Sequence, residues 1–214
     1  HEVTNVGTDR SQLSAMANKT KAALAVEELD VVADRGYFSS LEILACNEAS
    51  VTVTLPKPVT SGIKAKGRFG KQDFRYVQED DVYICPARER LTYRYTNEEN
   101  GLTLRRYWTT VCRDCAIKHR CTTGKERRIT RWQHEHLIEE VQARLDSHPE
   151  KMRQRRETVE HPFGTIKARM GATHFLMKTL PRVRTEMALH VLAYNLTRLI
   201  NILGAGPLMV AMKA

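Results

Sequence analysis

The sequence predicts an α/β domain with a β-rich, cysteine-containing insertion. Short apolar runs alternate with helical patterns over the first 55 residues, β-branched and aromatic residues dominate the middle, and helical periodicity returns near residue 132. The chain has 214 residues, of which 42% are hydrophobic, so it can bury a core and disorder is not expected.

The N-terminal part is predicted to contain two parallel strands. A helix is expected over 9–24, with Asp9 as its N-cap, and the apolar run 31–33 suits a strand buried on both faces. A helix from Ser39 and a strand over 51–55 follow, and this alternation favours a parallel sheet with right-handed crossovers. The second helix is expected to face the core with Leu41, Leu44 and Ala45.

The pattern changes in the middle of the chain. Residues 56–71 are rich in Lys, Gly and Pro and indicate an exposed basic loop. Four β-like segments follow between residues 74 and 111, and Asn100-Gly101 is a strong hairpin signal between the last two. Antiparallel strands inside an α/β pattern indicate an insertion.

Helical periodicity resumes over 132–145, again from about 149, and over 183–203, where a broad apolar stripe is expected to pack on the sheet. The predicted organisation is a partial α/β core over 1–55, a basic loop and β-rich insertion over 56–130, and a helical remainder of the core over 131–214.

The charge balance favours a polyanionic partner such as DNA. Lys and Arg number 34 against 25 Asp and Glu, which gives a net charge of +9. No apolar run is long enough to span a bilayer and no signal peptide is visible, so a membrane protein is excluded and the cytoplasm is favoured. A solvated basic face is the alternative to DNA contact. The candidate contacts are Lys57, Lys64, Lys66, Arg68, Lys71, Arg105, Arg106, Lys118, Arg120, Lys125, Arg127, Arg128 and Arg131.

Asp34 directly follows the predicted strand 31–33 and precedes Gly36. The carboxyl end of a parallel strand is where α/β sheets bind ligands, and a glycine there leaves room for a phosphate or a metal ion. Asp before Gly also has a purely structural use, because it satisfies nearby backbone amides. Taken alone, Asp34 leaves both interpretations open.

A second carboxylate of interest lies on a predicted helix. Arg153, Arg156 and Glu160 are spaced three and four residues apart and therefore share one helix face. A structural row of ion pairs has the same pattern. Pro162 removes an amide donor, so a kink or a fresh helix start is expected there.

Two segments together resemble a known family. Arg156, Glu160 and Lys167 have the spacing of the Y-R-E-K signature of a group of bacterial insertion-sequence transposases. The sequence EHPFGTIK over 160–167 resembles the third-acid segment of these DDE-type enzymes, and VVADRGYF over 31–38 resembles their second-acid motif. The resemblance covers nearly the whole chain, including the cysteine insertion.

The resemblance implies a ribonuclease-H-like fold in which two Asp and one Glu hold two Mg²⁺ (or Mn²⁺) ions. Asp34 and Glu160 would each bind a metal ion, while Arg156 and Lys167 would neutralise phosphate beside the scissile bond. Arg153 stands where the signature has Tyr, so the contact made by that Tyr is not carried over.

The resemblance also bears on the remaining acids. Glu157 is an alternative one turn earlier, but the spacing to Lys167 favours Glu160. The first acid of the family would precede His1, and Asp9 is interpreted only as a helix cap. The chain starts without an initiator Met inside an apparent strand over 1–6, as expected of an N-terminally incomplete fragment. We therefore expect the 214-residue chain alone neither to cleave nor to join DNA, and Mg²⁺-dependent cleavage of transposon ends by it would contradict this.

Four of the five cysteines fall within the insertion and are candidate ligands of structural Zn²⁺: Cys85, Cys112, Cys115 and Cys121. A C-x₂-C pair with two further thiols suits tetrahedral zinc, which stabilises small β modules, and His119 is a substitute ligand. Reduced thiols without metal, and a redox pair, are the alternatives. Cys46 lies on an apolar helix face and is expected to be buried.

These features together predict a transposase that binds DNA, cleaves phosphodiester bonds with Mg²⁺ and transfers DNA strands. One alternative is a non-catalytic, zinc-stabilised DNA-binding remnant of such an enzyme. Another is a metal-dependent nuclease without strand transfer. The sequence leaves a homodimer open.

Overall fold

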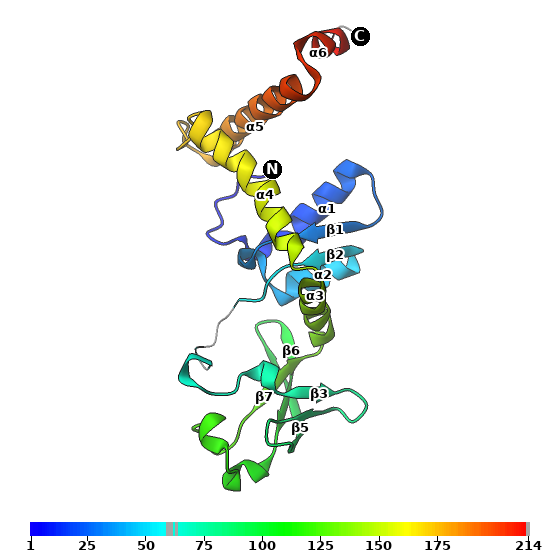
Figure 1. Ribbon diagram of the computed structural model, residues 1–214, viewed down its shortest axis with the longest axis vertical. Helices are drawn as coiled ribbons and strands as arrows, with labels where there is room; N and C mark the ends of the chain where they lie inside the picture. The colour runs from blue at the N-terminus through cyan, green and yellow to red at the C-terminus, as the bar shows by residue number, and fades with distance from the viewer. Residues whose placement is uncertain (59–61, 63, 213–214) are drawn as a thin grey trace.

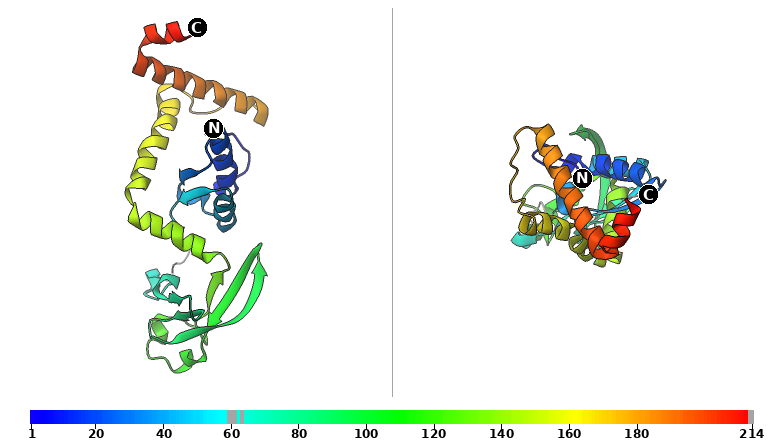
Figure 2. Two further views of the ribbon diagram at one scale, coloured as in Figure 1. Left: turned by 90° about the vertical axis from the view of Figure 1, so that its right-hand side faces the viewer. Right: turned by 90° about the horizontal axis from the view of Figure 1, so that it is seen from above.

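The computed structural model describes residues 1–58, 62 and 64–212, which form three tiers along the long axis (Figure 1). Helices α5 (Leu180–Leu203) and α6 (Ala205–Ala211) lie at one end, and a small parallel sheet with its helices lies in the middle. An antiparallel sheet lies at the other end. Helix α4 (Glu150–Gly164) links the middle tier to α5, as the side view in Figure 2 shows.

The middle tier is the predicted parallel unit. Strands β1 (Leu29–Val32) and β2 (Val51–Thr54) pair in parallel, with Leu29 opposite Val51. Helices α1 (Leu13–Leu24) and α2 (Ser40–Glu48) precede and connect these strands. The predicted strand–helix–strand alternation is therefore confirmed, and the fold class is α/β.

Two predictions about the first residues are wrong. Residues 1–6 form no strand, and Arg184 of α5 donates instead to the carbonyl of Val3 (2.9 Å). Asp9 is not a helix cap: it begins a short 3₁₀ turn, η1 (Asp9–Ser11), while the hydroxyl of Thr8 accepts the Arg10 amide (3.4 Å). Thr8 takes the cap position because its hydroxyl accepts the otherwise unpaired amide of Arg10. The Asp9 carboxylate therefore does not cap this turn.

The buried face of α2 differs in part from the prediction, although Leu44 packs against the core as expected. Ile43 and Cys46 are buried at 3% and 0% exposure, whereas Leu41 is 46% exposed. The stripe that packs on the sheet is therefore centred on 43 and 46, which are three residues apart and share a helix face. Leu41 lies close to Gly101, at the tip of a hairpin in the antiparallel sheet. The predicted burial of Cys46 is confirmed.

The antiparallel sheet has five strands in sequence order: β3 (Arg75–Val77), β4 (Val82–Ile84), β5 (Arg90–Glu99), β6 (Leu102–Trp108) and β7 (Ile129–Trp132). We refer to residues 69–132 as the β module. Asn100 and Gly101 join β5 to β6 with φ angles of 52° and 75°, as the predicted type I′ hairpin turn requires. Strand β7 was not predicted, because its four residues follow a charged segment and are too few to show an alternating pattern.

Two hydrophobic cores stabilise the molecule. The larger one joins α1, α2, both parallel strands and α3 (Glu135–Ser147), and it includes Trp132 at the end of β7. The smaller one lies inside the β module and consists of Phe74, Tyr83, Leu91, Tyr107 and Ile129. Trp132 therefore connects the β module to the α/β tier.

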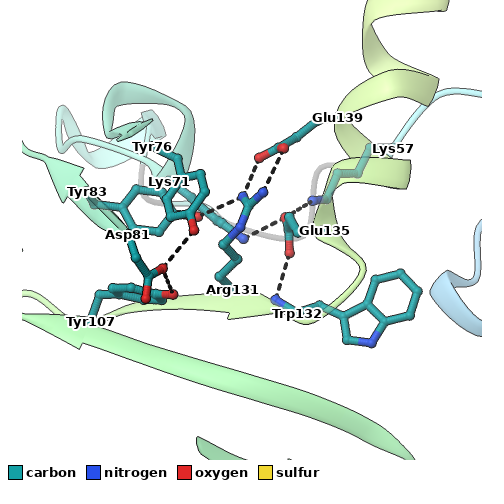
Figure 3. A network of polar contacts seen from close by, with 10 residues as sticks. All are labelled: Lys57, Lys71, Tyr76, Asp81, Tyr83, Tyr107, Arg131, Trp132, Glu135 and Glu139. Atoms are coloured by element: carbon teal, nitrogen blue, oxygen red, sulfur yellow. Dashed lines mark hydrogen bonds and ion pairs between the residues drawn. The ribbon is translucent and has the colours of Figure 1, made fainter. Parts of the chain in front are cut away.

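A polar network fixes the β module against α3 (Figure 3). Arg131 of β7 forms two hydrogen bonds to Glu139 (2.5 and 2.9 Å) and lies 3.8 Å from the ring centre of Tyr76. Glu135 accepts from Lys71 (2.6 Å) and from the Trp132 amide (3.1 Å). Both cations thus pair with carboxylates, and Arg131 is buried at 8% exposure while the Lys71 side chain is 37% exposed.

Replacing Glu135 with Gln is expected to destabilise the fold by about 2 kcal/mol at neutral pH, because Lys71 then loses its buried partner. Burial acts to raise the pKa of Glu135, but Lys71, the Trp132 amide and Lys57 hold this pKa below its usual value. The stabilisation is thus present above the unfolded pKa of about 4.3 and lost as pH falls through the lower folded pKa.

Urea denaturation at pH 7 and near pH 3 measures both effects. The matched control is Glu140→Gln on the same helix, where the carboxylate is 56% exposed and pairs with Arg144 at 3.8 Å. A surface pair of this kind contributes less than about 1 kcal/mol. Equal losses for the two variants, or a Glu135→Gln deficit that persists in acid, would contradict the prediction.

The C-terminal helices depart from two expectations. Helix α4 contains Pro162 without a fresh start, and the chain changes to a π-helical turn over Thr165–Arg169, where the Met170 amide donates to Thr165 (3.1 Å). Helix α5 does not pack its apolar stripe on the sheet: Leu189 and Ile202, for example, are 59% and 66% exposed. Only Glu186 of this helix is buried, and α5 lies at one end of the molecule, beyond the parallel sheet. Within the part of the chain that the structure describes, no helix has the length and hydropathy to cross a bilayer.

Candidate active site

Asp34 lies at the carboxyl end of β1, in the turn that leads into η2 (Arg35–Tyr37). One carboxylate oxygen accepts the Gly36 amide at 2.7 Å, and the other accepts Arg155 at 2.8 Å. A Cβ at Gly36 would lie 3.0 Å from the Asp34 Oδ1, so a larger residue here would have to displace this carboxylate. The structural interpretation of Asp34 is therefore confirmed, because it caps the turn, and the same carboxylate also has a charge partner from another element.

Glu160 lies on α4, and the structure brings it to the same cation as Asp34. The Arg155 Nη1 is 4.0 Å from the Glu160 Oε1, while the Arg155 Nη2 contacts Asp34. The Arg155 side chain is 16% exposed, compared with 43% for Asp34 and 63% for Glu160. Two carboxylates that are 126 positions apart in the chain thus face a single guanidinium group.

The other acid on this helix is directed elsewhere. Glu157 lies 3.8 Å from Arg153, and both side chains are at least 70% exposed. Arg156 and Lys167 are exposed, on α4 and on the π-helical turn after it. The structure therefore brings Asp34 and Glu160 together, and it leaves the Arg156 and Lys167 side chains open to solvent.

Sequence reasoning missed two residues of this site. Arg155 adjoins the signature residue Arg156, and nothing in the local sequence distinguishes their roles. Asp9 was interpreted only as a cap, but its Oδ2 lies 3.9 Å from the position of a Cβ at Gly36. Burial raises the pKa of Tyr37, and the carboxylates of Asp9 and Asp34 add to this rise while Arg155 opposes it. Asp9 and Tyr37 are therefore neighbours of the Asp34 carboxylate.

A family model described as a transposase DDE domain matches residues 84–200, which is more than half of the chain. The chain belongs to this DDE transposase family. The match contains Arg155, Arg156, Glu160 and Lys167, whereas Asp34 lies before it. Searches of curated proteins and of solved structures each found no match.

The match to the DDE transposase family also contains the four cysteines of the β module, and the structure places them around one pocket. Burial raises the pKa of the Cys121 thiol; the thiols of Cys112, Cys85 and Cys115 add to the rise and Arg127 opposes it. The Glu89 amide donates to the Cys85 sulfur at 3.3 Å. Among the residues that the structure describes, all five cysteines are free thiols, and no group of three or more acids, His or Cys is arranged to hold a metal ion.

The basic residues of this DDE transposase domain differ in their surroundings. Several pair with acids inside the β module: Arg105 contacts Asp81 at 2.5 Å, Arg106 contacts Glu99, and Arg128 contacts Glu126 at 2.9 Å. Three further candidates are exposed: Lys66, Arg120 and Lys125. Residues 59–61 and 63 of the basic loop, and the side chain of Lys64, lie outside the described residues.

The basic loop and the cysteine segment are joined. The Phe69 amide donates to the carbonyl of Arg120 at 2.8 Å, and the Arg120 guanidinium lies 5.0 Å from the Phe69 ring centre. This contact holds the end of the loop beside the segment between β6 and β7. The two exposed basic groups of the sequence are therefore parts of one region.

Proposed function

We propose that this DDE transposase chain contributes two metal ligands, Asp34 and Glu160, to a ribonuclease-H-like catalytic site that cuts DNA and transfers its strands. The observation that carries the proposal is the shared contact of both carboxylates with Arg155. Opposed carboxylates that already attract one cation suit a hard divalent ion, because Mg²⁺ and Mn²⁺ prefer oxygen ligands. When bound, the metal ions would supply an activated nucleophile and stabilise the leaving oxygen.

The residues of the chain itself have distinct tasks in this proposal. Asp34 is held in one orientation by the Gly36 amide, so its second oxygen is directed at the space toward α4. Glu160 faces the same space from α4. Arg156 and Lys167 stay exposed and are available to neutralise a phosphate that enters the site.

The test is divalent-metal binding, measured with Mn²⁺ by electron paramagnetic resonance on the purified chain. Asp34→Asn and Glu160→Gln are each expected to weaken Mn²⁺ binding at least about tenfold, since even outer contacts of metal sites contribute that much. Glu157→Gln removes an equal charge from the same helix and is the matched control, with an expected change below about threefold. Equal effects of Glu157→Gln and Glu160→Gln would contradict the proposed site and favour a non-catalytic DNA-binding protein.

We also propose that the β module holds structural Zn²⁺ through Cys85, Cys112, Cys115 and Cys121. The proposal is supported by the shared pocket of the four thiols and by the amide that Glu89 directs at the Cys85 sulfur. A hydrogen bond of this kind orients a ligand sulfur. The 3₁₀ turns η5 (Thr110–Asp114) and η6 (Lys118–Arg120) carry or flank three of the proposed ligands.

DNA is the proposed partner of the exposed basic region. Sequence-independent contact with the phosphate backbone needs accessible cations, and Lys66, Arg120 and Lys125 provide them. Arg131 is excluded from this surface because it is 8% exposed and paired with Glu139. The interface that we propose is thus smaller than the charge pattern of the sequence predicts.

A further inference from the structure

The guanidinium of Arg155 occupies the space between the two proposed metal ligands. We propose that Arg155 is a built-in counter-ion of the Asp34–Glu160 pair, which a divalent cation must displace before it can bind both carboxylates. This inference rests on the proposed function, because it takes Asp34 and Glu160 as the metal ligands. It assigns a role to a residue outside the signature spacing.

The geometry supports a bridging cation. Two different nitrogens of Arg155 are directed at two different carboxylates, at 2.8 Å for Asp34 and 4.0 Å for Glu160. The arginine is the least exposed of the three side chains, so its charge is only partly screened by water. Lys151, one turn earlier on α4, pairs with Asp30 of β1 at 2.7 Å and fixes the helix against this strand. The position of Arg155 therefore does not depend on its own ion pairs alone.

Removal of Arg155 would leave the ligands in place. Asp34 retains the hydrogen bond from Gly36 at 2.7 Å, and this bond fixes its carboxylate without any help from α4. Glu160 is 63% exposed and lies 4.0 Å from Arg155, so its conformation owes little to the arginine. The main effect of the guanidinium on a second cation at this place is thus electrostatic repulsion.

Other charges near the pair act in the opposite direction. The Asp9 carboxylate lies beside Gly36 and adds negative charge, which attracts a cation. With Arg155 neutralised, Asp9, Asp34 and Glu160 would leave an uncompensated negative site. Such a site binds divalent ions more tightly, since the repulsion between like charges a few ångströms apart is removed.

The experiment compares Mn²⁺ binding to four forms of the 214-residue chain. Arg155→Met is expected to bind Mn²⁺ about tenfold more tightly than the unaltered chain, because a positive charge next to the site has been removed. Arg155→Lys keeps the charge and is expected to change the affinity less than about threefold. Arg156→Met is the matched control: it removes an equal charge from the neighbouring, exposed position of the same helix.

Two outcomes would overturn the inference. Arg155→Met could bind Mn²⁺ equally or more weakly, which would make Arg155 a structural or a positioning residue. Arg155→Met and Arg156→Met could also show the same gain in Mn²⁺ affinity, which would mean that the gain comes from the net charge of the chain. Thermal unfolding without metal shows whether Arg155→Met is folded. If Arg155→Met is not folded, the unaltered chain is titrated with Mg²⁺ while the NMR signal of the Arg155 side chain is monitored. A signal that does not change refutes displacement of the guanidinium.

The same data separate this inference from the proposed function. If Mn²⁺ binding by the unaltered chain does not depend on Asp34, the proposed metal site itself fails. If it depends on both Asp34 and Glu160 while Arg155→Met has no effect, the metal site stands and only the counter-ion role of Arg155 fails. The double variant Asp34→Asn/Arg155→Met is expected to lose the gain of the single Arg155→Met.

Discussion

The Cys115→Ser chain is expected to lose bound zinc and to unfold its β module well below the melting temperature of the unaltered chain. The core of this module is small: Phe74, Tyr83, Leu91, Tyr107 and Ile129 are its buried residues. A core of this size rarely supplies enough hydrophobic free energy by itself, and a structural metal commonly makes up the difference. We expect a loss of about 3 kcal/mol or more, which corresponds to a fall of about 10 °C in melting temperature for a chain of this length.

Zinc content measured by inductively coupled plasma mass spectrometry and melting followed by calorimetry test this together. The reduced, unaltered chain is expected to carry about one equivalent of zinc. Cys46→Ala is the matched control, since Cys46 is fully buried in the other core. It should keep the zinc and lose about 1 kcal/mol. Less than about a tenth of an equivalent of zinc in the unaltered chain, with unchanged melting for Cys115→Ser, would refute the zinc site.

The pH dependence of the zinc content also distinguishes zinc from a redox pair. Zinc binds deprotonated thiolates and releases their protons. Zinc affinity is therefore expected to fall as the pH is lowered.

The sequence predicted the features that depend on local patterns. The two parallel strands follow from short apolar runs, and the β5–β6 turn follows from Asn100-Gly101, since both residues there adopt positive φ. Helix bounds were also close: the helix expected over 183–203 extends over Leu180–Leu203. These elements are determined by neighbours in the chain, so no tertiary information was needed.

The missed features depend on contacts between distant elements. Arg155 and Arg156 are adjacent and chemically identical, and only the docking of α4 beside β1 turns one toward Asp34 and the other toward solvent. Leu41 and Ile43 likewise have similar hydrophobicity, and only the packing of α2 in the larger core shows that Ile43 is buried and Leu41 exposed. The exposed face of α5 could not be foreseen either, because periodicity predicts an apolar stripe but not the surface that would cover it.

Removal of three positive charges from the basic region is expected to weaken DNA binding on the order of 500-fold at 0.1 M salt, since each neutralised phosphate contributes about eightfold there. The variant combines Lys66→Gln and Lys125→Gln of the proposed interface with Arg113→Gln, which removes a further exposed cation from η5 in the segment between β6 and β7. Arg120 is kept, since its guanidinium stacks on Phe69 and its carbonyl accepts the Phe69 amide. Fluorescence anisotropy with a duplex of random sequence, at several salt concentrations, measures the affinity.

The salt dependence decides whether these residues bind phosphate. The slope of log affinity against log salt concentration is expected to become less negative by about three, which is about one for each phosphate that is no longer neutralised. A control that replaces Lys178, Arg182 and Arg198 with Gln removes the same charge from the α5 end of the molecule, where these side chains are exposed. Its affinity should change less than about threefold, because charges beyond a Debye length are screened. Equal losses of affinity for both variants would mean that DNA binding depends on the net charge of the chain. The β module would then not be the DNA interface.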